Sequence, residues 1–290
     1  MDVAPAASSG ERCTACGEQL ASHRRDCIVC GAANEVPNVR IAQSSAEGAA
    51  LRARLDTAEI SARAKGCLTT LNEFGVAVLS SRAVIARNIG QVHDIAKSDN
   101  ELYVPFHQRV AAGAQVPRNN PWDPGRPAVE ATIFPYYHQE ISYAALSLDC
   151  RGLTAYGAYS IVLKDQAIAL RASVFEENPF LFTKRHKILA GQPCIAGYRA
   201  TWSARDILAK AKLHHLISSS TTPDKFAGIL MVQGLGTGDP DYVEVHIFGS
   251  IHRRAIERVI GPAPKSRADK DILKSVEKAL AQVGATLEVV

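Results

Sequence analysis

Apolar and polar side chains alternate along residues 241–248, which have the sequence Asp-Tyr-Val-Glu-Val-His-Ile-Phe. A period of two is typical of a half-buried β-strand, because successive side chains of a strand point to opposite faces of the sheet. Glu244 and His246 would share the exposed face, roughly 7 Å apart. Glycines and a proline are frequent in the preceding residues, 234–240. We therefore predict a strand that presents a carboxylate directly behind a glycine-rich loop.

Apolar residues at helical spacing predict several helices. The longest begins at a capping box, Ser44-Ser-Ala-Glu47, in which the Glu47 side chain is expected to reach back to the start of the helix, and it ends at Gly66. Further helices are expected at 165–171, 203–214, 251–259 and 272–283. Strand-like runs occur at 141–148, 158–163, 227–232 and 286–290, the last as an edge strand.

The remaining segments are less regular. Residues 35–43 show little periodicity and are interpreted as a linker, and the turn-rich residues 104–126 as a long loop. Residues 67–97 fit either a helix or a strand. The mixture predicts an α+β protein with four parts: a disordered tail at 1–10, a small cysteine-containing module at 11–34, a linker and helical segment at 35–98, and a larger α+β domain at 99–290, which is the candidate for any catalytic site.

The composition is that of a globular protein, since 47% of the 290 residues are hydrophobic and 21% are charged. A net charge of +4 permits contact with a polyanion without requiring it. No run approaches the roughly 18 apolar residues of a membrane span, and the N-terminus lacks the features of a secretory signal. We therefore expect a cytoplasmic protein that does not associate with membranes.

Four of the seven cysteines form two Cys-x-x-Cys-Gly units, at 13–17 and 27–31. Each unit forms a knuckle in which two thiolates converge on one ion and the glycine permits a tight turn. Four sulfur ligands give closed tetrahedral coordination, which suits structural Zn²⁺ and leaves no open position for catalysis. The segment resembles a zinc ribbon, and alternatives for its cysteines are an iron–sulfur centre or four unrelated buried thiols. The expected ligands are Cys13, Cys16, Cys27 and Cys30.

Zinc ribbons of this kind serve as nucleic-acid grips, protein docks or inert caps. His23, Arg24 and Arg25 lie between the two knuckles and would suit a phosphate contact, although a solvated turn explains them more simply. On this ground we expect the ribbon to bind a macromolecular target, either a protein or a nucleic acid.

Two stretches resemble motifs of bacterial and phage-type ADP-ribosyltransferase-like domains. The first is Leu-Thr-Ala-Tyr-Gly-Ala-Tyr-Ser-Ile-Val-Leu-Lys at 153–164, followed by Arg-Ala-Ser-Val-Phe at 171–175. The second, 243–251, resembles the last motif of that superfamily, where the catalytic glutamate lies on a strand just after a loop. The resemblance covers about residues 130–260 and implies a split, mixed β-sheet that clasps NAD⁺.

The resemblance also implies roles for individual residues. Glu244 takes the position of the catalytic glutamate, and His246 is a second catalytic candidate on the same strand face. An ionised carboxylate beside the ribose would stabilise the positive charge that develops when the nicotinamide–ribose bond breaks. A simpler explanation of Glu244 is a charge on a solvated strand face. The candidates for binding NAD⁺ are Ser147, Tyr156, Ser160 and Arg171.

Tyr242 departs from the superfamily pattern, because arginine-modifying members carry Gln or Glu two residues before the catalytic glutamate. This difference favours another acceptor, or no transfer. We expect an NAD⁺-dependent ADP-ribosyltransferase or NAD⁺ glycohydrolase, of toxin or phage-defence type, with structural Zn²⁺ and with NAD⁺ as substrate. The main alternative is a non-catalytic zinc-ribbon protein that binds nucleic acid or a protein partner. A weaker one is a metal-assisted hydrolase that uses His138 and His246.

Overall fold

The computed structural model describes residues 12–21, 23–97, 99, 103–113, 125–234 and 238–290. The tail expected at 1–10 lies outside this part of the chain, as do residues 114–124 of the expected long loop and 235–237 of the glycine-rich loop. None of the helices in the described part combines the length and the apolar composition that crossing a bilayer requires.

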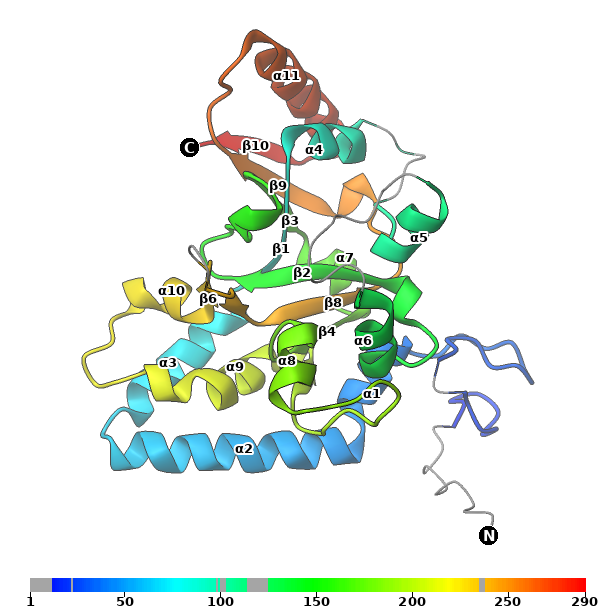
Figure 1. Cartoon of the computed structure of the whole chain (residues 1–290), viewed down its shortest axis with the longest axis vertical. Helices are drawn as coiled ribbons and strands as arrows, with labels where there is room; N and C mark the ends of the chain where they lie inside the picture. The colour runs from blue at the N-terminus through cyan, green and yellow to red at the C-terminus, as the bar shows by residue number, and fades with distance from the viewer. Residues whose placement is uncertain (1–11, 22, 98, 100–102, 114–124, 235–237) are drawn as a thin grey trace.

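A mixed, eight-stranded β-sheet runs through the centre of the molecule (Figure 1). The strand order is β10-β9-β3-β1-β2-β8-β4-β5, and neighbours are antiparallel except β9 and β10. The strands are β1 (Arg82–Arg87), β2 (Ile141–Ser147), β3 (Tyr159–Leu163), β4 (Ala172–Phe175), β5 (Arg199–Thr201), β8 (Glu244–Phe248), β9 (Ile256–Gly261) and β10 (Thr286–Val289). A separate pair joins β6 (Met231–Val232) to β7 (Asp241–Tyr242). The α+β class predicted from the sequence is confirmed.

Helices cover the two faces of the sheet unequally. The larger apolar core is shared by one face with α2 (Ser45–Ala64), α3 (Leu68–Leu79), α4 (Ile89–Ala96), α7 (Asp165–Ile168), α9 (Arg205–Leu213), α10 (Phe226–Leu230) and α11 (Arg267–Ala281). A smaller aromatic core lies on the other face with α1 (Pro37–Gln43), α6 (Arg126–Ile133) and α8 (Pro179–Arg185). The short α5 (Phe106–Ala111) contacts the 3₁₀ turn His138–Glu140 that precedes β2.

Strand β8 lies between β2 and β4, in the interior of the sheet. Val245 and Ile247 enter the larger core, whereas Glu244 and His246 point to the opposite face, so the predicted alternation is confirmed. The predicted exposure of the polar face is wrong, because Glu244 is 4% and His246 1% exposed. The smaller core and the segments around it cover that face as well, and β8 is therefore buried on both sides.

Several predicted elements are present with shifted ends. The strands expected at 141–148, 158–163 and 286–290 are β2, β3 and β10, and the helices expected at 165–171, 203–214 and 272–283 are α7, α9 and α11. The long helix is α2, and Ser44 Oγ accepts a hydrogen bond from the Glu47 N–H (3.4 Å). The Glu47 carboxylate does not complete the capping box. It accepts from the Gly197 N–H (2.5 Å) and pairs with Arg199 (3.0 Å), which are distant in the sequence.

Two predictions fail where an apolar run suits both helix and strand. Residues 227–232, expected as a buried strand, form most of α10 and the short strand β6. Residues 251–259, expected as a helix, form a 3₁₀ turn (Arg253–Ala255) and most of β9. Strand β9 pairs with β3 on one side and β10 on the other, so hydrogen bonding to distant segments decided its conformation.

The segment before residue 99 contributes more to the sheet than a linker would. Residues 37–43, expected as linker, form α1, and Pro37 is tolerated because it lies in the first turn. Residues 67–97, whose sequence pattern fits either a helix or a strand, form α3, β1 and α4. Strand β1 lies between β3 and β2, in the middle of the sheet. The α+β body of the protein therefore includes elements on both sides of residue 99.

Candidate active site and metal centre

The four cysteines expected to bind zinc converge near the N-terminus. Their Sγ atoms all lie within 4.8 Å of one another, with 3.6 Å for both the Cys13–Cys30 and the Cys16–Cys27 pairs. A tetrahedral site with Zn–S bonds of about 2.3 Å has sulfur–sulfur edges of about 3.8 Å. The four thiols therefore fit one metal ion such as Zn²⁺, with all coordination positions taken by protein.

The two knuckles have the same local geometry. Gly17 (φ 76°) and Gly31 (φ 71°) adopt left-handed conformations, and each N–H donates to the carbonyl of the first cysteine of its unit at 2.9 Å. The module contacts the body of the protein through the His23 ring, 5.4 Å from the Tyr136 ring, and through a hydrogen bond from Arg40 to Ala21 O (3.3 Å).

Among the described residues, the four cysteines form the sole group of three or more potential ligands close enough to share a metal ion. His138 and His246, the candidates for a metal-assisted hydrolase, belong to no such group.

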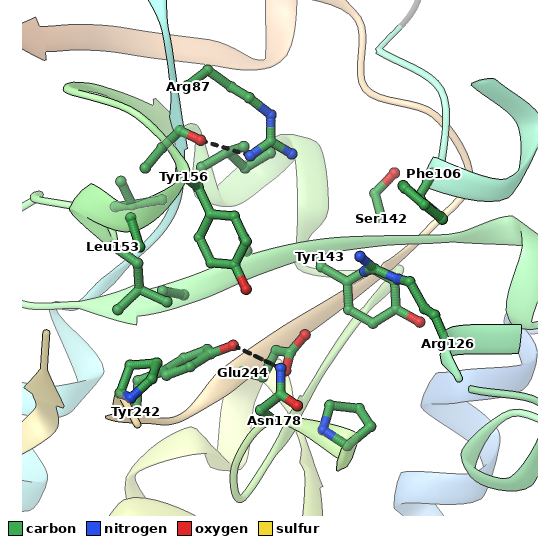
Figure 2. Close-up of a pocket in the computed structure, with 18 of the residues that line it drawn as sticks. Arg87, Phe106, Arg126, Ser142, Tyr143, Leu153, Tyr156, Asn178, Tyr242 and Glu244 are labelled. Atoms are coloured by element: carbon green, nitrogen blue, oxygen red, sulfur yellow. Dashed lines mark hydrogen bonds between the residues drawn. The ribbon is translucent and has the colours of Figure 1, made fainter. Parts of the chain in front are cut away.

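A cavity of about 330 Å³ lies on the sheet face that carries Glu244 (Figure 2). Strands β1, β2 and β8 contribute to its base, and α5, α6, the 153–156 turn and the start of α8 contribute to its walls. The charged side chains that line it are Arg87, Arg109, Arg126, Glu130, Asp239 and Glu244. The aromatic ones are Tyr103, Phe106, Tyr143, Tyr156, Phe180 and Tyr242. The cavity thus combines stacking surfaces with several fixed charges.

Glu244 is one of two buried acids that line this cavity, the other being Glu130. Burial raises the pKa of Glu244 to about 8; the negative charge of Glu130 adds to this, while Arg126 and a hydrogen bond from Tyr242 oppose it. The Tyr242 hydroxyl donates to Oε2 of Glu244 (3.3 Å) and accepts from the Asn178 amide (3.5 Å; Figure 2). Glu244 is therefore mostly protonated at neutral pH, with its side chain held by a neutral phenol.

His246 lies beside Glu244 and not in the cavity lining. Its ring packs among Phe134, Tyr143 and Phe175, at centroid distances of 4.6, 5.4 and 5.5 Å. Burial, and secondly the charge of Arg199, lowers its pKa well below the usual range, so the ring is neutral. The 3.9 Å between Nε2 and Oε1 of Glu244 is too long for a hydrogen bond.

Of the four residues expected to bind NAD⁺, only Tyr156 lines the cavity. Tyr156 lines the cavity with Glu244 and is about half exposed, at 48% (Figure 2). Ser147 and Ser160 are buried outside it: Ser147 donates to Asp149 (2.8 Å), and Ser160 accepts from the Gly152 N–H (2.9 Å).

Arg171 also lies outside the cavity lining. Its guanidinium donates to the carbonyl oxygens of Ala167 (3.0 Å), Phe248 (2.7 Å) and Ser250 (2.8 Å). These hydrogen bonds hold the end of β8 in place. The Arg171 side chain therefore has a structural role and does not point to a ligand in the cavity.

Sequence reasoning missed the charged wall of the cavity. Arg126 and Glu130 project from α6 and form an ion pair one helical turn apart. Their spacing of four residues is the sequence signal for the pair, but the predicted loop ends at Arg126 and no element is predicted for residues 127–130. Glu130 also binds His107 (2.6 Å). Arg87 and Tyr143 reach the cavity through the strand order, and Asn178 through the start of α8. No local sequence pattern shows this arrangement.

No protein-family model matches the chain, and no curated protein matches it in sequence. Neither comparison therefore supports the resemblance to ADP-ribosyltransferases.

Proposed function

We propose that the protein is an NAD⁺-dependent ADP-ribosyltransferase-like enzyme or an NAD⁺ glycohydrolase. One observation carries the proposal: the buried Glu244 carboxyl group lines the same cavity as Tyr156 of the Tyr-Gly motif, although the two residues are far apart in the sequence. The mixed sheet, with Glu244 on an interior strand, is compatible with the split sheet that the resemblance implies.

The chemistry requires one carboxylate at the reacting ribose. When the nicotinamide–ribose bond breaks, its electron pair leaves with nicotinamide and positive charge develops on the sugar. The cationic nicotinamide ring would favour ionisation of Glu244, because an opposite charge nearby lowers the pKa of a carboxyl group. The ionised carboxylate stabilises the developing charge. It can then take the proton that water, or an acceptor group, releases on attacking the ribose carbon.

Tyr242 bears on the choice of acceptor. It occupies the position at which arginine-modifying members of the resembled superfamily carry Gln or Glu, and its side chain is buried against Glu244 rather than presented to solvent. Its hydroxyl holds Oε2 of Glu244 by a hydrogen bond. We therefore favour water, or an acceptor other than an arginine side chain.

In this proposal the cysteine module is a zinc ribbon that docks a macromolecular target. Arg24 and Arg25 are exposed between the knuckles. Ile28 and Val29, at the tip of the second knuckle, are 68% and 64% exposed. The exposed arginines suit a nucleic acid as the target, and the exposed apolar side chains suit a protein.

Release of nicotinamide from labelled NAD⁺ tests the proposal. Glu244→Gln keeps the size of the side chain and removes its ability to ionise, and we expect it to lower the rate by about 100-fold or more. Glu277→Gln makes the same change at an exposed position of α11 and should leave the rate unchanged. Equal release by the wild type and Glu244→Gln, or no release by the wild type with any acceptor, would contradict the catalytic role.

A further inference from the structure

Arg109 is a cation without a counter-charge in the described part of the chain. It projects from α5 into the cavity lining, and its guanidinium lies 4.7 Å from the centroid of the Tyr103 ring. No ion pair joins it to another described residue, and its buried Nε has no hydrogen-bond partner among them. A half-buried guanidinium is costly to leave in this state, since buried charges are ordinarily paired.

The acidic residue on the neighbouring helix, Glu130, already has two partners. Glu130 pairs through one oxygen with Arg126 and through the other with His107 (2.6 Å). Arg126 in turn stacks against Phe106 and Tyr143, at 4.5 and 5.0 Å. Burial, and secondly the charge of Arg126, lowers the pKa of Arg109, as expected for two cations that lack a shared anion.

The other acids of the cavity do not supply the missing charge. Glu244 is largely protonated near neutral pH, because its pKa is about 8. Asp239 is exposed to solvent and forms no ion pair with a described residue. The wall formed by α5 and α6 therefore carries positive charge that the described carboxylates do not neutralise.

We propose that Arg109, together with Arg126, forms an anion subsite that binds a phosphate group of a nucleotide. A guanidinium offers a planar fork of donors that matches two phosphate oxygens. Tyr103, Phe106 and Tyr143 frame the subsite with aromatic faces that can contact the rest of a nucleotide. The inference rests on the proposed function only for the choice of NAD⁺ as that nucleotide.

Calorimetric titration with three ligands tests the subsite. ADP-ribose carries the phosphates without nicotinamide, nicotinamide riboside carries nicotinamide without phosphate, and inorganic phosphate carries the anion alone. We expect Arg109→Gln to weaken ADP-ribose binding by about tenfold or more and to leave nicotinamide riboside binding unchanged. Inorganic phosphate should compete with ADP-ribose in the wild type and less effectively in the variant.

Two further variants keep the outcome interpretable. Arg63→Gln removes the same charge from an exposed position of α2 and should bind ADP-ribose like the wild type. Arg109→Lys keeps the charge and should lose less affinity than Arg109→Gln. The subsite would be overturned if Arg109→Gln left ADP-ribose affinity unchanged, or if Arg63→Gln lowered it as much as Arg109→Gln does. It would also be overturned if Arg109→Gln and Arg109→Lys lost equal affinity, or if the wild type did not bind ADP-ribose.

The Glu244→Gln variant separates this inference from the proposed reaction. It should bind ADP-ribose as the wild type does while failing to release nicotinamide. ADP-ribose binding that depends on Arg109, in a protein that releases no nicotinamide, would retain the subsite and reject the reaction. If substitution of Arg109 changed neither nicotinamide release nor ADP-ribose affinity, the reaction would be retained and the subsite rejected.

Discussion

Glu244 and Glu130 line the same cavity in different surroundings. Glu130 accepts from Arg126 and binds His107, whereas Glu244 accepts a hydrogen bond from the neutral Tyr242. Both are buried, but Glu130 pairs with a guanidinium, whereas the hydrogen-bond partner of Glu244 is an uncharged phenol. The pKa of Glu244, about 8, allows this carboxyl group to exchange a proton near neutral pH.

The raised pKa of Glu244 predicts how stability depends on pH. Between the ordinary carboxyl pKa of 4.5 and about 8, the folded protein holds a proton that the unfolded chain releases. The contribution of Glu244 to the free energy of unfolding is therefore full below pH 4.5 and is lost as pH rises toward 8, by about 1.4 kcal/mol per pH unit.

Glu244→Gln removes this loss. Denaturant unfolding at pH 5, 6, 7 and 8 should show the variant gaining stability relative to the wild type as pH rises, by roughly 2–4 kcal/mol in total. Glu277→Gln, at an exposed site, provides the baseline. A difference between Glu244→Gln and wild type that stays constant across this range would contradict the buried, protonated state.

At the scale of elements, the end of β1 and the entry to β3 approach each other closely. Gly157 (φ 151°) is in the Tyr-Gly motif, and a Cβ atom there would lie 2.0 Å from the backbone carbon of Arg87. The residue just before it, Tyr156, and Arg87 itself both line the cavity. The glycine therefore permits two segments that form the site to lie against each other.

Gly157→Ala should be strongly destabilising. The added methyl group meets backbone atoms of Arg87, which cannot move aside as a flexible side chain would, and we expect a loss of about 2–4 kcal/mol in the free energy of unfolding. Gly48→Ala is the matched control, because Gly48 lies in α2 with nothing within 4 Å of the added Cβ atom and should gain up to about 1 kcal/mol. Similar effects of the two substitutions would show that the close approach is not a real constraint.

At the scale of the whole molecule, the cysteine module and the α+β body have separate interiors. The module buries only a small cluster, Cys13, Leu20 and Cys27, with Ala32 packed against it. The body has its own extensive core on the sheet. Because so small a cluster cannot stabilise a fold alone, the metal must supply the folding free energy of the module.

Metal removal should therefore unfold the module and leave the body folded. After chelation, hydrogen exchange should accelerate in residues 12–34 and stay unchanged in β1, β2 and β8, with one zinc released per chain. Cys16→Ser should abolish metal binding, whereas Cys194→Ser, outside the cluster, should not. Loss of protection throughout the sheet on chelation would show that the two parts fold as one unit.

What the sequence alone determined is local. The Cys-x-x-Cys-Gly units specify their own turns, so the four ligands could be named without knowledge of the fold. The alternation of residues 243–247 likewise assigns Glu244 and His246 to one strand face, because the side-chain period is a property of the strand itself.

Only the tertiary structure decided what surrounds those side chains. The order β1-β2-β8 brings Arg87, Tyr143 and Glu244 to one cavity, and α6 places Arg126 and Glu130 beside them. The burial that raises the pKa of Glu244, and the burial and nearby Arg126 charge that lower the pKa of Arg109, arise from such contacts between distant segments. Desolvation and charge pairing depend on every group within a few ångströms, and a sequence pattern records only the neighbours along the chain.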